Sequence, residues 1–218
     1  MSNEMILYIG EKNVSSWSMR AWVALTRKGV RFEERTISLL EDRGRAQRRK
    51  IGPTGRVPVL HHDDLVIPDS LAILEYVEET FPAPSYPALW PSDRATRARA
   101  RWLAATMHSG FPKLRESMSF HLCFLPERPA ASAEALREAN EVLELWEGAL
   151  AQRKLAGPFL AGPFSGADAM FAPVVWRLTA FSVPAGEAAA AYMSAVLAQP
   201  AVKAWMDAAR ALPPVAEE

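Results

Sequence analysis

Apolar residues recur with two different spacings in the first part of the chain. A short apolar run at Met5–Ile9 predicts a β-strand. Beyond it, Met19, Trp22 and Val23 recur at helical spacing. Gly29 follows them and is suited to end a helix. The chain is therefore predicted to open with a strand and a helix.

The next segments predict a second strand, a hairpin and another helix. Arg31–Leu39 shows partial alternation of apolar and polar residues, and the charged stretch after it has no clear pattern. Val57–Leu60 and Leu65–Ile67 flank the polar run His61–Asp64, which predicts a hairpin with a polar turn. Ser70–Phe81 places its apolar residues on one helical face. Two strands joined through a helix predict a parallel pair with a right-handed crossover.

The pattern changes after a proline-rich segment, which predicts a linker at residues 82–91 between two domains. Residues 1–81 are predicted to form an α/β domain and residues 92–218 an all-helical domain. Segments rich in alanine from Gly186 to Ala211 add one or two shorter helices. Three stripes at helical spacing precede them: Leu103, Met107, Phe111, Leu114 and Met118; Leu136, Ala139, Leu143, Trp146 and Leu150; Phe171, Val174, Leu178 and Phe181.

Two local features refine the helical part. Pro112 lies inside the first stripe, where it removes a backbone donor and predicts a kink. Ser165 and Asp168 have the spacing of a capping box that opens the third stripe. We expect that pair to serve folding rather than chemistry.

Composition excludes several classes of protein. Of 218 residues, 50% are hydrophobic, and 25 Lys and Arg balance 25 Asp and Glu. A neutral chain gives no general attraction to nucleic acid or to anionic membranes. The start of the chain lacks the pattern of a secretory signal, and no apolar run is long enough to span a bilayer. With a single cysteine, Cys123, the sequence predicts a cytoplasmic protein without a membrane or nucleic-acid partner.

Three short segments could carry chemistry. They are Ser15–Ser18 at the start of the first helix, Gly55–Leu60 with its proline, and Ile67–Ser70 at the start of the last helix of this domain. A helix N-terminus offers unpaired N–H groups and favours anions. The serines and the Asp-Ser pair could equally be plain helix caps. The proline could begin a strand, or it could follow a cis bond that frees the preceding backbone for a ligand.

The order of these segments resembles the cytosolic glutathione transferase family. The matching runs are SSWSMRAWVAL, GRVPVL and IPDSLAILEYVEETFP, and SGADAM resembles the capping box of the family's C-terminal domain. The type is bacterial and serine-based, and distantly similar to the zeta class. The resemblance implies a thioredoxin-like N-terminal domain, an all-α helical bundle after it, and glutathione as a co-substrate.

The resemblance also implies roles for residues of the N-terminal domain. Ser15, or alternatively Ser16, corresponds to the serine that donates a hydrogen bond to the glutathione sulfur and stabilises the thiolate. Val57 is implied to pair with the cysteinyl part of glutathione, and Pro58 to fix that geometry. Asp69 and Ser70 are implied to bind the γ-glutamyl end. Arg56 could bind the glycyl carboxylate or be an ordinary surface arginine.

The second substrate is expected to bind between the domains. Trp17, Met107, His108 and Phe111 are candidates to line its pocket, with ordinary core packing as the alternative for Met107 and Phe111. His108 could also be satisfied within the bundle. No metal site is expected, since adjacent histidines do not have the spacing of zinc ligands.

The resemblance predicts an enzyme that joins glutathione to a small electrophilic, apolar substrate, typical of detoxification, and acts as a homodimer. Two alternatives remain. One is a glutathione-dependent isomerase similar to maleylacetoacetate isomerase, although Trp17 stands where that class typically has cysteine. The other is a non-catalytic interaction module that keeps the fold.

Overall fold

The N-terminal domain has the predicted order of strands and helices. The structure is a computed structural model that describes residues 4–215. The stretch that the pattern left open is a helix, so the order is β-α-β-α-β-β-α. The elements are β1 (Met5–Ile9), α1 (Ser16–Lys28), β2 (Glu33–Thr36), α2 (Asp42–Ile51), β3 (Val59–His62), β4 (Leu65–Ile67) and α3 (Ser70–Thr80).

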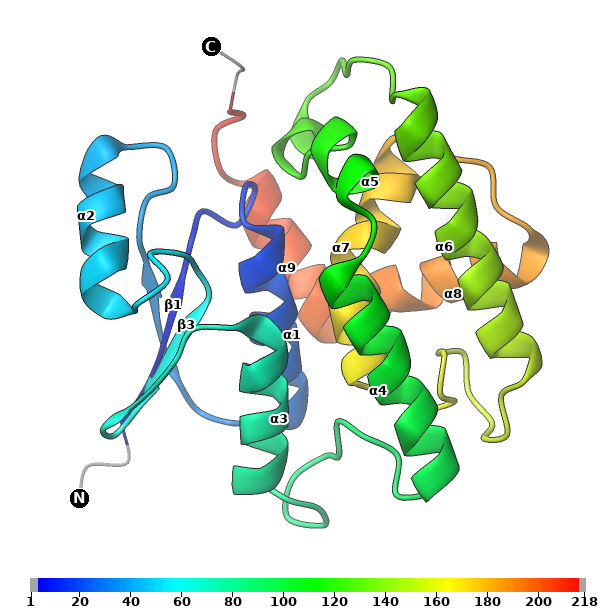
Figure 1. The fold of residues 1–218 in the computed structure, drawn as a ribbon, viewed down its shortest axis with the longest axis horizontal. Coiled ribbons are helices and arrows are strands. Elements are labelled where there is room, and N and C mark those ends of the chain that lie inside the picture. Colours follow the sequence, from blue (N-terminus) through cyan, green and yellow to red (C-terminus); the bar gives the residue numbers. More distant parts are fainter. Residues whose placement is uncertain (1–3, 216–218) are drawn as a thin grey trace.

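The C-terminal domain contains helices and no strand among its described residues (Figure 1). The segment rich in alanine forms two helices, as the pattern allowed. The elements are α4 (Arg94–Ser109), α5 (Pro112–Ser117), the short 3-10 helix η1 (His121–Phe124), α6 (Ala133–Ala151), α7 (Gly166–Ala180), α8 (Glu187–Ala198) and α9 (Pro200–Arg210). None of the helices in residues 4–215 is both long and apolar enough to cross a bilayer.

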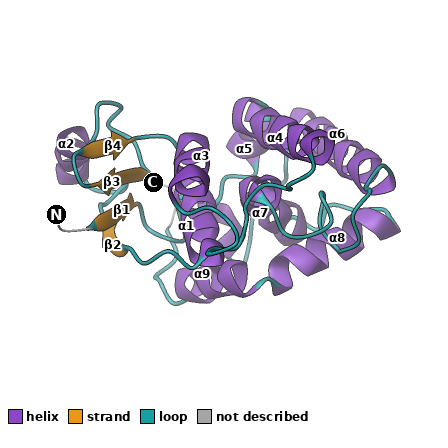
Figure 2. Ribbon diagram, turned by 90° about the horizontal axis from the view of Figure 1, so that it is seen from below, coloured by secondary structure: helices purple, strands orange, loops and turns teal. Residues whose placement is uncertain are grey.

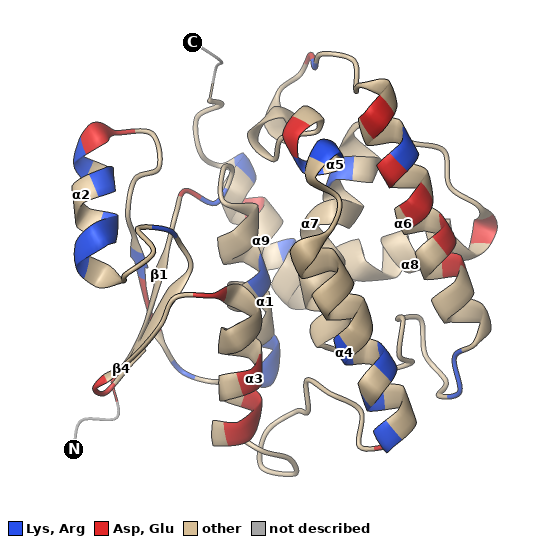
Figure 3. Ribbon diagram, viewed as in Figure 1, with Lys and Arg blue, Asp and Glu red and all other residues tan. Residues whose placement is uncertain are grey.

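The sheet is four-stranded, in the order β2-β1-β3-β4. The predicted parallel pair is confirmed, because β1 runs parallel to β2, with Leu7 opposite Glu34. On its other side β1 pairs antiparallel with β3, with Leu7 opposite Leu60. Figure 2 shows α2 on one face of the sheet and α1 and α3 on the other, where the helical domain follows. Lys and Arg gather on α2 (Figure 3), away from the junction of the domains.

Helix α1 begins and ends where its sequence indicates. Ser15 is its N-cap, and the Ser15 hydroxyl accepts a hydrogen bond from the backbone N–H of Ser18. Gly29 closes the helix in the left-handed conformation at φ 73°, which glycine adopts without steric cost. This capping fixes the position of the serines at the edge of the domain junction.

The hairpin differs from the prediction at its turn. The expected polar turn covered His61 to Asp64, but β3 continues through His62, and only Asp63 and Asp64 form the turn. The His62 side chain is buried and its Nδ1 lies 2.7 Å from the Tyr76 hydroxyl. The prediction of a surface turn was therefore wrong for His62, because a polar ring with a buried partner can occupy a strand position.

Pro112 interrupts the first helical stripe more strongly than the predicted kink. Helix α4 ends at Ser109, and α5 begins at Pro112 itself, which suits the first position of a helix. Phe111 between them adopts the left-handed conformation at φ 58°. The stripe therefore belongs to two helices, and the break turns α5 across the junction.

Helix α7 connects the two domains. It packs against α1 of the N-terminal domain and against α4 of the C-terminal domain. The predicted capping box is present, because Asp168 Oδ2 accepts hydrogen bonds from the Ser165 backbone N–H at 2.7 Å and from its hydroxyl at 2.8 Å. Gly166 donates its N–H to the Leu89 carbonyl at 2.8 Å. These bonds anchor the start of α7 in the interior.

Candidate active site

A cavity of about 450 Å³ lies at the junction of the two domains. It brings together the start of α1, the segment before β3 and the start of α3, which are the three segments singled out in the sequence. The side chains around it come from both domains. They are Trp17, Thr54, Arg56, Val57, Pro58, Pro68, Asp69, Ser70, His108 and Arg115.

Val57 and Pro58 form one wall of the cavity. The peptide bond between them is cis, which is one of the two arrangements considered for this proline. Strand β3 begins only at Val59, so both residues precede the hydrogen-bonded ladder. Arg56 is exposed and lies at the same edge of the cavity.

Asp69 and Ser70 form the adjacent wall at the start of α3. Asp69 is a helix cap, because its Oδ1 accepts hydrogen bonds from the N–H groups of Leu71 and Ala72, each at 2.9 Å. The Ser70 side chain is 1% exposed, and its Oγ has no hydrogen-bond partner. Buried polar atoms are normally paired, so this hydroxyl is a free group that a polar ligand can satisfy.

Ser15 and Ser16 lie behind the cavity rather than on its surface. Ser15 Oγ donates to Ser18 Oγ at 2.7 Å. Ser16 Oγ accepts a hydrogen bond from Nη2 of Arg177 at 3.2 Å. Both serines are buried, and neither is among the lining residues, whereas the next residue, Trp17, is. Both hydroxyls are thus close to the cavity while already engaged within the protein.

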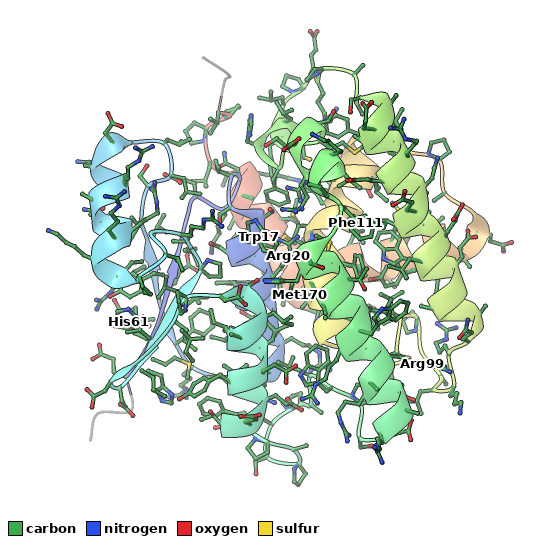
Figure 4. All side chains as sticks on the ribbon, in the orientation of Figure 1. Trp17, Arg20, His61, Arg99, Phe111 and Met170 are labelled. Carbon is green, nitrogen blue, oxygen red and sulfur yellow. The ribbon has the colours of Figure 1, made fainter. Side chains whose placement is uncertain are left out.

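Trp17 is surrounded by cationic side chains. The guanidinium of Arg20 lies 4.1 Å from its ring centroid, and that of Arg115 lies 5.3 Å away. The ring of His108 meets Trp17 edge-on at 5.4 Å between centroids. Figure 4 shows Trp17 and Arg20 at the junction with α7, where Arg20 Nε donates to the Met170 carbonyl at 2.9 Å.

The four candidates for the second-substrate pocket separate into two groups. Trp17 and His108 line the cavity. Met107 is fully buried in the core, and Phe111 is half-buried but not among the lining residues. Arg115 lines the cavity and was not singled out from the sequence. No local motif marks Arg115, because its place over the Trp17 ring depends on how the helical domain packs.

Burial shifts the ionisation of several groups near this site. Desolvation, and then the neighbouring positive charges, lower the pKa of Arg20 well below its ordinary value. Burial lowers the pKa of Arg177 to about 10, so the Arg177 guanidinium remains protonated at neutral pH. Burial raises the pKa of the Cys123 thiol to about 11. That thiol is protonated at neutral pH and does not suit the role of a nucleophile.

No group of three or more metal-ligating side chains converges anywhere in residues 4–215. The chemistry that the described cavity offers is instead that of a polar and cationic pocket. It combines a free hydroxyl, a carboxylate, the segment Val57–Pro58 before β3, and arginines. Such a set suits a ligand that carries carboxylates, an ammonium group and amides.

Comparison with known proteins identifies both domains. The glutathione S-transferase N-terminal domain family matches residues 11–85, and the glutathione S-transferase C-terminal domain family matches residues 129–208. Glutathione S-transferase 1 of Dianthus caryophyllus is 32% identical over 85% of this chain and 83% of its own length. A probable maleylacetoacetate isomerase of Caenorhabditis elegans is 38% identical, over 52% of this chain.

The match to that isomerase spans only 51% of its length, so the chain matches about half of such relatives. Among solved structures, a glutathione transferase homologue from a Burkholderia strain with bound glutathione is 31% identical, with a TM-score of 0.74. The similarity covers 96% of this chain and 100% of that one. The chain therefore belongs to the glutathione S-transferase family.

Proposed function

We propose that the protein is a glutathione transferase that activates the glutathione thiol for attack on a small electrophilic substrate. The observation that carries the proposal is the convergence of Val57–Pro58, Asp69–Ser70 and the start of α1 around one cavity. In the glutathione transferases that the sequence resembles, the corresponding segments bind glutathione. Positioning two substrates in such a cavity supplies a large part of catalysis in transfer reactions.

Ser15 is proposed to activate the thiol. A free cysteine thiol has a pKa of about 8.5, so most of it is protonated at neutral pH. A hydroxyl donor together with the partial positive charge of a helix N-terminus stabilises the thiolate. Ser15 Oγ currently donates to Ser18 Oγ, so its hydrogen would turn toward the sulfur when glutathione binds. Ser16 is the alternative: its Oγ accepts from Arg177, which leaves its own hydrogen available to donate.

The ends of glutathione are proposed to bind the two walls of the cavity. The free Oγ of Ser70 suits the α-carboxylate of the γ-glutamyl end, and Oδ2 of Asp69 suits its ammonium group. Val57 would pair with the cysteinyl part through its backbone. Arg56 would meet the glycyl carboxylate, since it lines the same cavity next to Val57.

A glutathione-dependent isomerase is a second candidate, because relatives over half of the chain are named maleylacetoacetate isomerases. The same site would then add the thiol to the substrate and release it again. A non-catalytic interaction module is disfavoured by the free Ser70 hydroxyl and the intact cavity.

We also propose a cytoplasmic homodimer with a role in detoxification. Exposed apolar side chains support the dimer, since large hydrophobic residues at a surface often mark an interface. Leu65 and Val66 on β4 and Trp102 on α4 are 53%, 46% and 57% exposed. Light scattering of the wild type and of Trp102→Arg would show whether the assembly depends on this surface.

Calorimetric titration with reduced glutathione, alongside a chloronitrobenzene conjugation assay, tests the function. Binding with turnover supports the transferase. Binding without turnover directs the search to a cis-diketo acid and the isomerase. Absence of binding at millimolar glutathione would contradict both enzymes and favour the interaction module.

A further inference from the structure

Three arginines from three helices converge behind and beside Trp17. Arg20 belongs to α1, Arg115 to α5 and Arg177 to α7. Arg20 donates to the Ser16 carbonyl at 3.0 Å, and Arg177 donates to the Ser16 hydroxyl at 3.2 Å. The guanidinium groups of Arg20 and Arg115 lie 4.1 Å and 5.3 Å from the Trp17 ring centroid, and Ser16 bonds both Arg20 and Arg177, so the three groups are near one another.

None of these arginines takes part in an ion pair within residues 4–215. The bonds of Arg20 and Arg177 go to backbone carbonyls and to Ser16. Nη2 of Arg20 and Nη1 of Arg177 are buried without any partner. Glu138 and Glu116 act electrostatically on Arg115 without forming an ion pair with it. Buried charges are normally paired, so a ligand carboxylate would supply the direct partner that the cluster lacks.

Arg115 is the member of the cluster that a ligand can touch. It is half-buried and lines the cavity, whereas Arg20 and Arg177 are buried behind it. Its Nε is held by the carbonyls of Gly110 and Phe111 at 3.3 and 3.2 Å. Its two Nη atoms make no hydrogen bond within the described residues. The fork of the guanidinium is thus fixed in position with its donors free.

Among residues 4–215, the C-terminal domain contributes His108 and Arg115 to the lining of the cavity. An apolar second substrate would need an apolar wall there, yet Met107 is buried in the core. A planar aromatic ring, Trp17, lies next to the free guanidinium. Carboxylates bind such a fork through two parallel hydrogen bonds.

We propose that the second substrate is a carboxylate-bearing electrophile whose carboxylate binds Arg115 beside Trp17. This inference rests on the proposed function. Arg20 and Arg177 add positive potential from behind, which strengthens the attraction in a partly buried site. In a substitution reaction, the thiolate sulfur forms a bond to the electrophilic carbon, the leaving group departs with its electron pair, and the thiol proton passes to water.

Glutathione itself carries carboxylates, and the geometry argues against their binding at Arg115. Its γ-glutamyl end is assigned to Asp69, which contacts His108 at 3.2 Å. His108 in turn contacts Trp17, and Arg115 lies over the Trp17 ring. Arg115 thus lines the cavity from the helical domain, whereas the residues assigned to glutathione line it from the N-terminal domain.

The test compares chloronitrobenzoate with the neutral chloronitrobenzamide of the same ring. Each kcat/KM is divided by the uncatalysed rate with glutathione, which removes the difference in intrinsic reactivity. We expect the wild type to prefer the carboxylate. Arg115→Gln should lower that preference by roughly 10- to 100-fold, the effect of losing a charge-assisted hydrogen bond. Arg115→Lys keeps the charge but not the fork, so it should retain part of the preference.

Both variants lose the Nε bonds, so their comparison isolates the charge. Lys113→Gln is the matched control, because Lys113 is on the same short helix, pairs with Glu116 and does not line the cavity. If neither compound turns over, the binding of nitrobenzoate and nitrobenzamide to the glutathione-saturated protein gives the same comparison by calorimetry.

The outcomes separate this inference from the proposed function. If the wild type binds glutathione but shows no preference for the carboxylate, the inference is overturned and the proposed function stands. The same holds if Arg115→Gln keeps the preference of the wild type. An Arg115→Gln variant that loses affinity for glutathione but keeps the preference would place a glutathione carboxylate at Arg115 and overturn it too. A wild type that does not bind glutathione would overturn both.

Discussion

Nε2 of His108 lies 3.2 Å from Oδ2 of Asp69, across the boundary between the two domains. The other oxygen of Asp69 caps helix α3. One carboxylate therefore holds the start of a helix, contacts the helical domain and faces the proposed glutathione-binding cavity. Substitutions at Asp69 can separate these roles.

Asp69→Asn should weaken glutathione binding by about 10-fold, because loss of a charged partner costs about 1.5 kcal/mol. The melting temperature should stay close to that of the wild type, because an asparagine oxygen can still cap the helix. Asp69→Ala should lose both the charged partner of glutathione and the helix cap, so its stability should also fall by about 1 kcal/mol. Calorimetry and thermal unfolding measure the two effects. Unchanged affinity in Asp69→Asn would contradict the proposed contact with the ammonium group.

Ser15→Ala should lower kcat/KM by roughly 10- to 100-fold, because a hydrogen bond to a charged group is worth about 1.5–3 kcal/mol. Glutathione affinity should stay near that of the wild type, since the hydroxyl contacts only the sulfur. The lost N-cap should also reduce stability by about 1 kcal/mol. Ser16→Ala is the comparison: a larger rate loss there would assign the sulfur contact to Ser16.

The stability of the protein should depend on pH through Asp168. Burial raises its pKa to about 6, against the hydrogen bonds from Leu160 and Ser165 that lower it. The pKa of an aspartate in the unfolded chain is about 3.9, so the folded state binds the proton more tightly. The resulting stabilisation is complete below about pH 4 and is lost as the pH rises through 6, a change of about 3 kcal/mol.

Asp168→Asn cannot titrate, and the comparison with it isolates this group. The unfolding free energy of the wild type minus that of the variant should fall by about 2 kcal/mol between pH 4 and pH 7. Urea unfolding at several pH values measures it. A difference that stays constant across this range would show that the carboxylate is not perturbed by burial.

Gly166→Ala should destabilise the protein by about 1–3 kcal/mol, the usual effect of overpacking. A Cβ at Gly166 would lie 2.4 Å from the Trp90 ring at the start of α7. Gly148→Ala is the control, because Gly148 lies in α6 with no atom within 4 Å of the added carbon. Gly148→Ala should instead stabilise the helix by about 0.5–1 kcal/mol. Urea unfolding measures both variants, and equal effects of the two substitutions would contradict the close contact at Gly166.

Much of the fold was predictable because its signals are local. The caps at Ser15 and Gly29, the parallel pair of β1 and β2, and the capping box of α7 all follow from short stretches of sequence. The exact domain bounds stay a prediction. The error at His62 arose from a distant partner, Tyr76, which only the fold brings within 2.7 Å.

The candidate site was predictable only in its N-terminal half. Val57–Pro58 and Asp69–Ser70 stand in recognisable motifs, and the structure brings them around one cavity with Trp17 and His108. The wall from the helical domain could not be foreseen. Met107 and Phe111 share a stripe with core residues, and helical periodicity does not show which face meets the other domain.

Most helices and strands, their order and the motifs that identify the family could be predicted from the sequence, because capping, periodicity and turn chemistry act over a few residues. The tertiary structure was needed to show which side chains from α5 and α7 lie near Trp17. Arg115 and Arg177 are far from Trp17 in the sequence, and both reach its surroundings from the helical domain. Their convergence depends on the packing of whole helices, so the charge of the pocket is a property of the assembled fold.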